Sequence, residues 1–415
     1  MKTCQIQEID SEVLNQKGLG CFGDEFIHIP VDDSDVKKGT LPQDHQEEPD
    51  SDKDSDMSDG EEAIHGDRRK NIETIISYMV DKDDAPWIQQ EHKPLDPFVR
   101  FHNEIIDYYK YYGPTEERDQ LGREFFEKVY DLIKKYNKKF AIEIYGSWAL
   151  GYYSILSKMD VTVLLPENPN RKKNAINQHL IDVKGEEDKY IKEQIANIYE
   201  FLIESNIFEE IELKNVETYP KLKITDKKSK LVMEIVFNQC KVIETKYQIK
   251  KFIVYFPGAK FLMLILKELL RSRDLHKLET GGLPQYYLLL LIINYFQDVF
   301  KEPGNEEMLL SDHLLNFLDL YGNKFNYKLL GISLRAGGCY FPREDKGWTD
   351  PPEESPFHVA LALEDPMNPV ENLGAKVTNM KQVQICFAYA YEAIRWNSGK
   401  RDSFLKCFLL KNPSK

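Results

Sequence analysis

The residues best suited to chemistry lie in one stretch, where a predicted strand at 140–145 runs into Gly146-Ser147. A loop of nine residues follows, and Ser157 then opens a second β-rich run that contains Lys158 and Asp160. Because successive strand residues point to opposite faces, positions 158 and 160 should project to the same side. A Gly-Ser turn lets the backbone approach a phosphate closely, and the Ser147 hydroxyl can donate a hydrogen bond to it. The spacing therefore favours a phosphate-handling site between two strands.

The elements that must position these residues follow from the hydrophobic spacing. A helix from Pro97 stops at Gly113-Pro114, and a second, amphipathic helix opens at Thr115. Beyond Asp160 the pattern predicts a long charged helix and then three strands, at 172–206, 211–213, 221–224 and 231–237. From 259 onward the pattern is mostly helical, broken by Gly281-Gly282 and by a Pro-rich loop at 342–356. The sum predicts an α/β palm of the catalytic type, followed by a helical domain.

Composition limits what the whole chain can do. With 415 residues it has room for two or three domains, and its formal net charge is −14. Such a charge disfavours a sequence-independent grip on nucleic acid by the whole surface, so RNA contact needs a local basic cleft or a partner. The six cysteines are scattered without zinc-ligand spacing, and neither a signal peptide nor a long apolar run is evident. We therefore expect an intracellular protein with no membrane association.

The N-terminal region has a composition of its own. Between 44 and 62 the chain has ten acidic residues against one lysine, and few apolar residues. A segment of this kind cannot bury enough apolar surface to offset the entropy lost on ordering. Residues 1–85 are therefore predicted to be largely disordered, and 397–415 to form a tail.

The segment from Tyr145-Gly-Ser to Asp160 resembles the Gly-Ser motif of the DNA polymerase β-like nucleotidyltransferase superfamily. From about 87 to 394 the chain resembles noncanonical poly(A) polymerases of the nuclear TRAMP-complex type. Five fragments in the family's order carry this resemblance: Trp87-Ile88 with His102-Asn-Glu-Ile, Gly258-Ala-Lys-Phe-Leu, Thr280-Gly-Gly-Leu-Pro-Gln-Tyr, Leu318-Asp-Leu-Tyr-Gly, and Leu363-Glu-Asp-Pro with Asn372-Leu-Gly. The resemblance implies a nucleotidyltransferase palm, a mixed sheet with flanking helices, at 115–240. It also implies a mostly helical poly(A)-polymerase-associated central domain, formed by 86–114 and 241–396.

In that family three carboxylates hold two divalent cations, which activate the RNA 3′-hydroxyl and neutralise the triphosphate. The resemblance assigns the metal and catalytic positions of this chain to Asp160 and Glu234, with Glu234 where the family has Asp. Lys158 stands where the family has its first metal-binding aspartate. An aspartate-to-lysine change replaces a ligand by a cation and alters the local charge by two units, which disfavours a metal there. Mg²⁺ or Mn²⁺ is expected if the protein is active, and otherwise no metal at all.

Two interpretations of Lys158 remain open. In the first, the protein has lost its metals and Lys158 simply pairs with Asp160 or Glu234. In the second, the Lys158 ammonium stands in for the charge of one metal, so that a nucleotide or an RNA phosphate still binds without turnover. Both interpretations place the weakness of the site in its metals rather than in its fold.

Further nucleotide-binding residues are implied by the resemblance, besides Gly146 and Ser147. Lys267 and Arg271 share a helix face at i and i+4 and match basic residues that clasp the triphosphate; the alternative is a solvated face with Glu268 nearby. Tyr286 matches an aromatic residue that stacks on the base, although a tyrosine in so apolar a helix also suits a core. Asn372 matches an asparagine that reads the base edge, but Ala375 replaces a usual basic or hydroxyl residue.

These observations predict a family member in RNA 3′-end processing or surveillance, catalytically impaired and acting as a subunit of an RNA-processing or RNA-silencing complex. The alternative is an active terminal adenylyl- or uridylyltransferase, and a third hypothesis is a nucleotide-sensing module. The expected partners are RNA, met through an RNA-binding protein, a helicase or a polymerase subunit, and a nucleoside triphosphate. The resemblance favours a nuclear location, with the cytoplasm as the alternative.

Overall fold

The computed structural model describes residues 85–92, 95–166, 180–214, 220–301, 307–348, 360–397 and 403–409. All of them belong to one compact unit, Ser58–Lys415. The predicted disorder of 1–85 concerns residues that, Ala85 apart, lie outside the described part of the chain, and most of the predicted tail lies outside it as well.

The first two long helices begin and end where local capping chemistry places them. Helix α3 (Pro97–Tyr112) starts where the Asp96 side chain accepts a hydrogen bond from the backbone N–H of Phe98, and it ends at Gly113. Helix α4 (Glu116–Tyr136) starts at Thr115, whose hydroxyl accepts from the backbone N–H of Arg118. Both starts were predicted from the sequence, and the structure confirms them.

The centre of the N-terminal half is a five-stranded mixed sheet. Its strands lie in the order β1 (Ala141–Tyr145), β2 (Met159–Leu164), β5 (Val232–Phe237), β4 (Lys221–Thr225) and β3 (Glu210–Lys214). Strands β2 and β5 are parallel, and the other neighbours are antiparallel. The sheet confirms the predicted α/β class.

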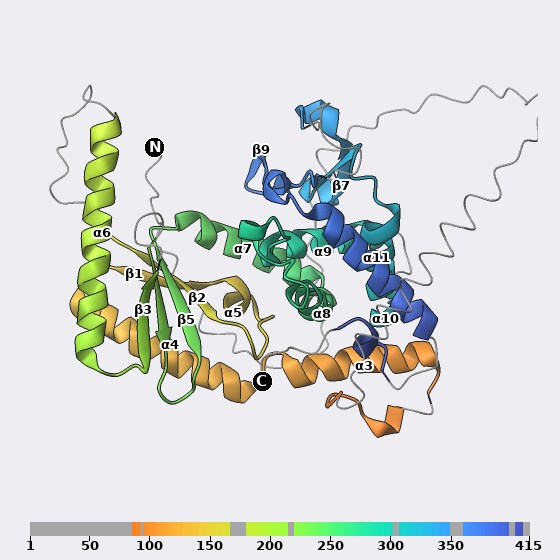
Figure 1. The fold of residues 1–415 in the computed structure, drawn as a ribbon, viewed down its shortest axis with the longest axis horizontal. Helices are drawn as coiled ribbons and strands as arrows, with labels where there is room; N and C mark the ends of the chain where they lie inside the picture. The colour runs from red at the N-terminus through yellow and green to blue at the C-terminus, as the bar shows by residue number, and fades with distance from the viewer. Residues whose placement is uncertain are drawn as a thin grey trace, which may run out of the picture. The chain divides into compact units, whose positions relative to one another are not determined.

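Helices α4 and α6 (Leu180–Ser205) pack on one face of this sheet (Figure 1). Apolar residues of both helices share a hydrophobic core with alternate residues of the strands: Phe125, Val129, Ile133, Ile195, Ile198, Leu202, Met159, Val161, Val163, Leu222, Ile224, Met233 and Ile235. Since strand residues alternate between faces, the residues between these core positions point to the opposite face. Asp160 and Glu234 are among them.

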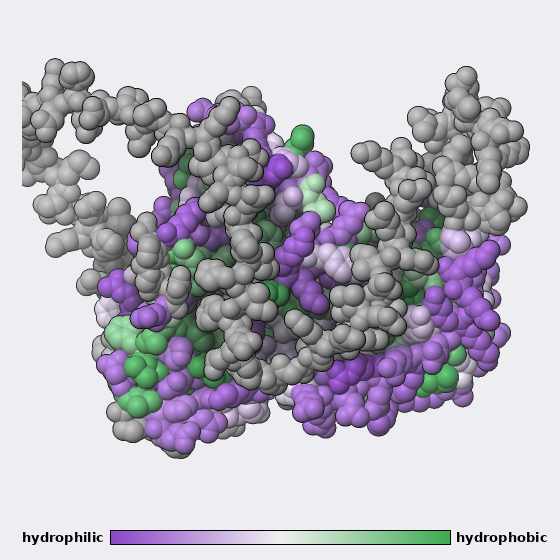
Figure 2. Space-filling model, turned by 180° about the vertical axis from the view of Figure 1, so that it is seen from behind, coloured by the Kyte–Doolittle hydropathy of each residue, from purple (hydrophilic) through white to green (hydrophobic). Residues whose placement is uncertain are grey.

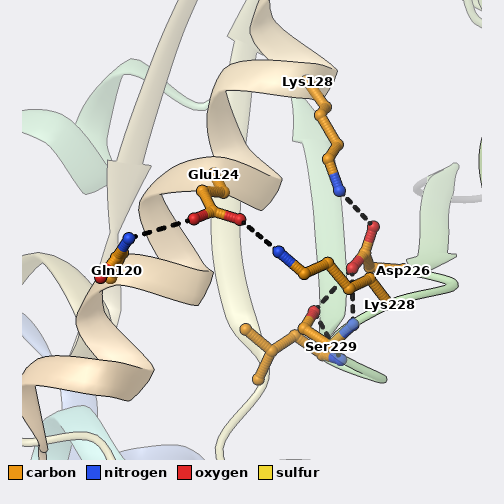
Figure 3. A network of polar contacts seen from close by, with 7 residues as sticks. Gln120, Glu124, Lys128, Asp226, Lys228 and Ser229 are labelled. Atoms are coloured by element: carbon orange, nitrogen blue, oxygen red, sulfur yellow. Dashed lines mark hydrogen bonds and ion pairs between the residues drawn. The ribbon is translucent and has the colours of Figure 1, made fainter.

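A polar network fixes α4 to the turn between β4 and β5 (Figure 3). The Asp226 carboxylate accepts hydrogen bonds from the Ser229 backbone N–H and hydroxyl, both at 2.8 Å, and from the Lys128 ammonium at 3.1 Å. Lys228 donates to Glu124 of α4 at 3.1 Å. Burial of Asp226 raises the pKa of its carboxyl, but these hydrogen bonds outweigh burial and leave the pKa lowered. The predicted polar turn is thus a closed, hydrogen-bonded one.

Helices dominate the C-terminal half. They are α7 (Cys240–Tyr255), α8 (Ala259–Arg271), α9 (Gln285–Val299), α10 (Leu310–Asp319) and α11 (Met380–Asn397). With α3 they enclose a second hydrophobic core, rich in leucine and isoleucine, to which α8 and α9 contribute most of their length. The predicted break at Gly281-Gly282 is present between η2 (Leu278–Thr280) and α9. The domain boundaries given above stay predictions.

Two small antiparallel sheets interrupt this helical part, and neither was predicted. One pairs β6 (Leu330–Ser333) with β7 (Cys339–Pro342), and the other pairs β8 (Glu364–Asp365) with β9 (Asn368–Asn372). Short turns of 3₁₀ or π helix complete the described elements: η1 (Gln90–His92), η4 (Leu320–Lys324), η5 (Arg335–Gly337), η6 (Arg343–Lys346), η7 (Leu373–Lys376) and η8 (Leu405–Cys407).

A buried carboxylate ties three distant segments of this half together. Glu104 of α3 accepts hydrogen bonds from the Trp87 indole N–H at 3.1 Å and from the backbone N–H groups of Phe404 and Leu405, at 2.7 and 3.2 Å. The Ser403 hydroxyl donates to the same carboxylate. Burial raises the pKa of Glu104, and the four hydrogen bonds oppose that rise.

Polar residues cover much of the described surface. In the view from behind (Figure 2), hydrophilic side chains predominate, and separate apolar patches lie toward the lower left and lower right. None of the helices within the described ranges is long and apolar enough to cross a membrane.

Candidate functional site

One row of residues crosses the whole sheet on the face that α4 and α6 leave uncovered. In register order the row contains Tyr145, Asp160, Glu234, Lys223 and Glu212, one residue from each strand. The parallel pairing of β2 with β5 places Asp160 directly opposite Glu234. The structure therefore brings together the two carboxylates that the sequence assigned to catalysis and metal binding.

The chain after β1 differs from the predicted Gly-Ser turn and nine-residue loop. It forms a short helix, α5 (Gly146–Leu150), which ends at Gly151 in the left-handed conformation. Gly146 has a φ of 66°, and a Cβ added there would lie 2.5 Å from the Asp160 Oδ2 atom. Only glycine fits this position, because both the backbone conformation and the close approach of the carboxylate exclude a side chain.

Ser147, the partner of Gly146 in the motif, is buried in the first turn of α5. Its backbone carbonyl accepts hydrogen bonds from the N–H groups of Gly151 and Tyr152, which close the short helix. The hydrogen bond from its hydroxyl to a phosphate stays a prediction.

Lys158 precedes the first residue of β2 and reaches across to the neighbouring strand. Its ammonium donates a hydrogen bond to the Glu234 Oε1 atom. Half of the Lys158 side chain and 26% of that of Glu234 remain exposed. An ion pair this accessible contributes at most about 1 kcal/mol to folding, so its significance is the charge it places in the site. Of the two partners considered for Lys158, the structure selects Glu234.

The carboxyl of Asp160 has a pKa well above its ordinary value. Burial raises its pKa to about 6, and the neighbouring charge of Glu234 adds to the rise. Three lysines oppose it: Lys267, Lys158 and Lys221. Of these lysines, Lys158 contacts the neighbouring carboxylate directly, through its ion pair with Glu234.

Lys267 connects helix α8 to the loop in front of β2. Its ammonium donates to the Ser157 hydroxyl at 2.7 Å, and that hydroxyl in turn accepts from the Ser154 backbone N–H at 2.8 Å. Burial lowers the pKa of Lys267 to about 8, while the charge of Asp160 counteracts that shift. The predicted basic residue thus lies beside the predicted carboxylate.

Arg271, one turn further along α8, forms a two-pronged pair with Glu268, at 2.8 and 2.6 Å. Lys267 and Arg271 share a helix face, as the spacing predicted. Of these two residues, only Lys267 is among the charges that act on Asp160. Glu268 does lie next to Arg271, and a role of Arg271 in clasping a triphosphate stays a prediction.

Tyr286 lies in the first turn of α9 and is about half-buried. Burial raises the pKa of its phenol, as do the charges of Asp365 and Glu371, while a hydrogen bond with Thr245 of α7 opposes the rise. The neighbouring Tyr152 is buried in the helical core, and this burial, with the charges of Asp160 and Tyr286, raises the pKa of its phenol. Stacking of Tyr286 on a base stays a prediction.

Asn372 uses its side-chain oxygen within its own loop. The Oδ1 atom accepts hydrogen bonds from the backbone N–H groups of Leu363 and Gly374, both at 3.0 Å. This oxygen shapes the loop that joins β9 to η7, which leaves the amide nitrogen for other contacts. Ala375 is exposed. Base reading by Asn372 remains untested.

Sequence reasoning missed two lysines that the fold brings to this region. Lys221 is the first residue of β4 and acts on Asp160. Lys241, in the first turn of α7, pairs with Asp365 at 2.7 Å and with Glu371 at 3.0 Å, and so joins α7 to the β8–β9 hairpin. No local spacing relates these partners, and only the alternation of lysines on β4 hinted at Lys221.

The residues present do not fit a site for two divalent cations. Two carboxylates are adjacent, one of them is paired with Lys158, and the third ligand position is that lysine itself. Within the described ranges no group of three or more acidic, histidine or cysteine side chains is placed to hold a metal ion. A pair of hard cations needs more carboxylate oxygens than this donor set provides.

Two sequence models of known families match the chain. Residues 101–252 match the poly(A) RNA polymerase, mitochondrial-like, central palm domain. Residues 310–371 match the Cid1 family poly A polymerase.

Curated relatives are similarly named. The poly(A) RNA polymerase CID14 of Cryptococcus neoformans is 26% identical over 349 residues, which cover 83% of this chain and 42% of that protein. Its counterpart cid14 of Schizosaccharomyces pombe is 23% identical, over 77% of this chain and 44% of that protein. This chain thus spans about two fifths of the length of these two relatives. A Drosophila melanogaster protein named as an inactive noncanonical poly(A) RNA polymerase, Trf4-2, is 24% identical over 70% of this chain and 67% of its own length.

Solved structures share the fold. The polymerase core of TRAMP, described as an RNA surveillance complex, aligns with a TM-score of 0.63 at 20% identity and covers 79% of this chain and 98% of that chain. A cytoplasmic RNA terminal U-transferase aligns with a TM-score of 0.57 at 18% identity, over 76% of this chain and 99% of that chain.

Proposed function

The chain belongs to the noncanonical poly(A) polymerase family, and from that membership we propose that it serves RNA 3′-end metabolism as a subunit that does not itself add nucleotides. One observation carries the proposal: the Lys158 ammonium pairs with Glu234 at the place where nucleotide transfer needs a metal-binding carboxylate. The fold around this pair is similar to that of the polymerase core of TRAMP.

The chemical consequence follows from charge. A metal at this position would meet an ammonium instead of a carboxylate oxygen, and Glu234 would have to give up its ion pair to bind it. Metal ions contribute several kcal/mol to a transition state of this kind. A loss of about 4 kcal/mol corresponds to a rate on the order of a thousandfold lower.

Assembly with other proteins is the second part of the proposal. Similarity to the polymerase core of an RNA surveillance complex supports a role as a complex subunit. The net charge of −14 favours RNA contact through an RNA-binding protein, a helicase or a polymerase subunit. A Drosophila relative that is named inactive shows that the family accommodates such members. We extend the proposal to a nuclear location, with the cytoplasm as the alternative.

A tailing assay tests the first part. The wild type, Lys158→Asp and the double variant Lys158→Asp/Glu234→Asp are incubated with an RNA oligonucleotide, ATP or UTP, and Mg²⁺ or Mn²⁺. We expect no extension by the wild type, and extension by one or both variants, because they restore the carboxylates. Lys228→Gln removes a comparable ion pair with Glu124 on the opposite face of the sheet and should leave the result unchanged.

The competing function is an active terminal adenylyl- or uridylyltransferase. Robust extension by the wild type, abolished by Asp160→Asn, would establish it and overturn the proposal. Purification of the tagged chain from cells tests the second part: a subunit should co-purify with RNA-processing proteins in stable proportion, whereas a free monomer would contradict that role.

A further inference from the structure

We propose that the cleft binds the polyphosphate of a nucleotide without a divalent metal, with the Lys158 ammonium in the place of the metal charge. This inference rests on the proposed loss of the metal pair. It differs from that proposal in predicting a ligand and a mode of binding.

The first step is the charge balance of the site. Three lysines, Lys158, Lys221 and Lys267, act on a pair of carboxylates, Asp160 and Glu234. A site with carboxylates alone repels a polyphosphate until metals neutralise it. Here lysine side chains accompany the two carboxylates, so the protein itself supplies neutralising charge.

The second step is the origin of two lysines in separate elements, α8 and the residue before β2. Lys267 lies on α8 and donates to the Ser157 hydroxyl at 2.7 Å. The next residue is Lys158, whose ammonium contacts Glu234. The two lysines therefore come from separate elements, and each ammonium is held by its own hydrogen bond, that of Lys267 to Ser157 and that of Lys158 to Glu234.

The third step is the capacity of Lys158 to bind a further group. An ammonium has three donors, and the hydrogen bond to Glu234 uses one of them. Half of the side chain is exposed, so phosphate oxygens can reach it. Gly146 itself has no side chain at its close approach to the Asp160 carboxylate.

The fourth step identifies the ligand class. Tyr286, half-buried in the first turn of α9, supplies an aromatic ring on the helix that packs against α8, the helix of Lys267. An aromatic residue beside a phosphate-binding cluster suits a nucleotide, whose base can stack while its phosphates contact lysines. A phosphate at an RNA end shares this chemistry and is the competing source.

Isothermal titration calorimetry with ATP, with inorganic tripolyphosphate and with an RNA oligonucleotide bearing a 3′-phosphate distinguishes these sources. Each ligand is titrated into the full chain in EDTA and in Mg²⁺, at constant ionic strength. We expect ATP to bind in EDTA at least as tightly as in Mg²⁺, and tripolyphosphate to compete with it. Lys158→Gln should weaken binding in EDTA about tenfold or more.

The decisive variant is Lys158→Asp, which should bind ATP only when Mg²⁺ is present. Lys228→Gln is the matched control and should bind as the wild type does, and thermal melting confirms that each variant is folded. ATP binding by the wild type that requires Mg²⁺, no ATP binding in EDTA, or unchanged binding by Lys158→Gln would each overturn the inference. Binding of the RNA alone would overturn the assignment to a nucleotide.

The two proposals can fail separately. An inactive wild type that binds no ATP in EDTA refutes only the metal-free site. A wild type that extends RNA with Mg²⁺ and binds ATP only with Mg²⁺ refutes both.

Discussion

Replacement of Gly146 by alanine tests whether the Gly-Ser segment is shaped by Asp160. Two effects add at this position. An alanine at a φ of 66° is strained, which costs about 1–2 kcal/mol. The new Cβ would lie 2.5 Å from the Asp160 Oδ2 atom, so the carboxylate or α5 must move, and overpacking of this kind costs about 1–3 kcal/mol more.

Gly151 provides a matched control at the other end of the same short helix. Its φ is 72°, and a Cβ there would have no atom within 4 Å. Gly151→Ala should therefore carry the backbone strain alone, about 1–2 kcal/mol, whereas Gly146→Ala should lose about 2–5 kcal/mol. The difference between the two variants isolates the contact with Asp160.

Urea unfolding followed by circular dichroism measures both variants, and titration with ATP in EDTA reports the state of the cleft. Gly146→Ala should unfold at lower urea than Gly151→Ala and should bind ATP more weakly. Equal destabilisation of the two variants would refute the reasoning, since the carboxylate would then have moved without cost. Loss of binding in Gly151→Ala as well would show that strain in α5, rather than the contact, controls the site.

Two other predictions follow from buried carboxylates. Glu104→Ala removes the acceptor of four hydrogen bonds and leaves the buried N–H groups of 404 and 405 unsatisfied. The variant should therefore be less stable than the wild type by about 3–5 kcal/mol and should show faster hydrogen exchange at 403–409. Unchanged exchange at 403–409 would contradict this role of Glu104. Folding raises the pKa of Asp160 from 3.8 to about 6, so the folded protein holds this proton more tightly than the unfolded chain does. The contribution of Asp160 to the free energy of unfolding is therefore largest below pH 3.8 and is lost as the pH rises through about 6. The free energy of unfolding of Asp160→Asn should lack this decline, and parallel pH profiles of variant and wild type would refute the shift.

Local chemistry explains what the sequence predicted well. Asp96, Thr115 and Gly113 fix the ends of α3 and α4 through contacts with residues no more than four positions away. The strands were recognisable because apolar residues alternate along them. The Gly-Ser segment was placed correctly but was predicted as a turn and a loop, whereas five residues close into α5.

Contacts between distant residues explain what was missed. From the sequence, both Asp160 and Glu234 were possible partners of Lys158. The choice of Glu234 depends on the register of β2 against β5 and on the start of β2 at Met159. The pairing of Lys241 with Asp365 joins segments with no shared spacing. The two-stranded sheets escaped notice because their strands contain two to five residues each, too few for an alternating pattern.

The parallel pairing of β2 with β5 also determines when the site can form during synthesis of the chain. In the chain, α6, β3 and β4 are synthesised between these two neighbours, so β2 can pair with β1 long before β5 emerges from the ribosome. Until then the backbone groups on the second edge of β2 are unpaired. The pairing with β5 joins segments far apart in the sequence, and such pairing forms slowly. Asp160 can therefore meet Glu234 only after β3, β4 and the start of β5 have been synthesised. A fragment that stops before 232 lacks β5 and Glu234, so the edge of β2 that pairs with β5 stays exposed and the pair of carboxylates is absent.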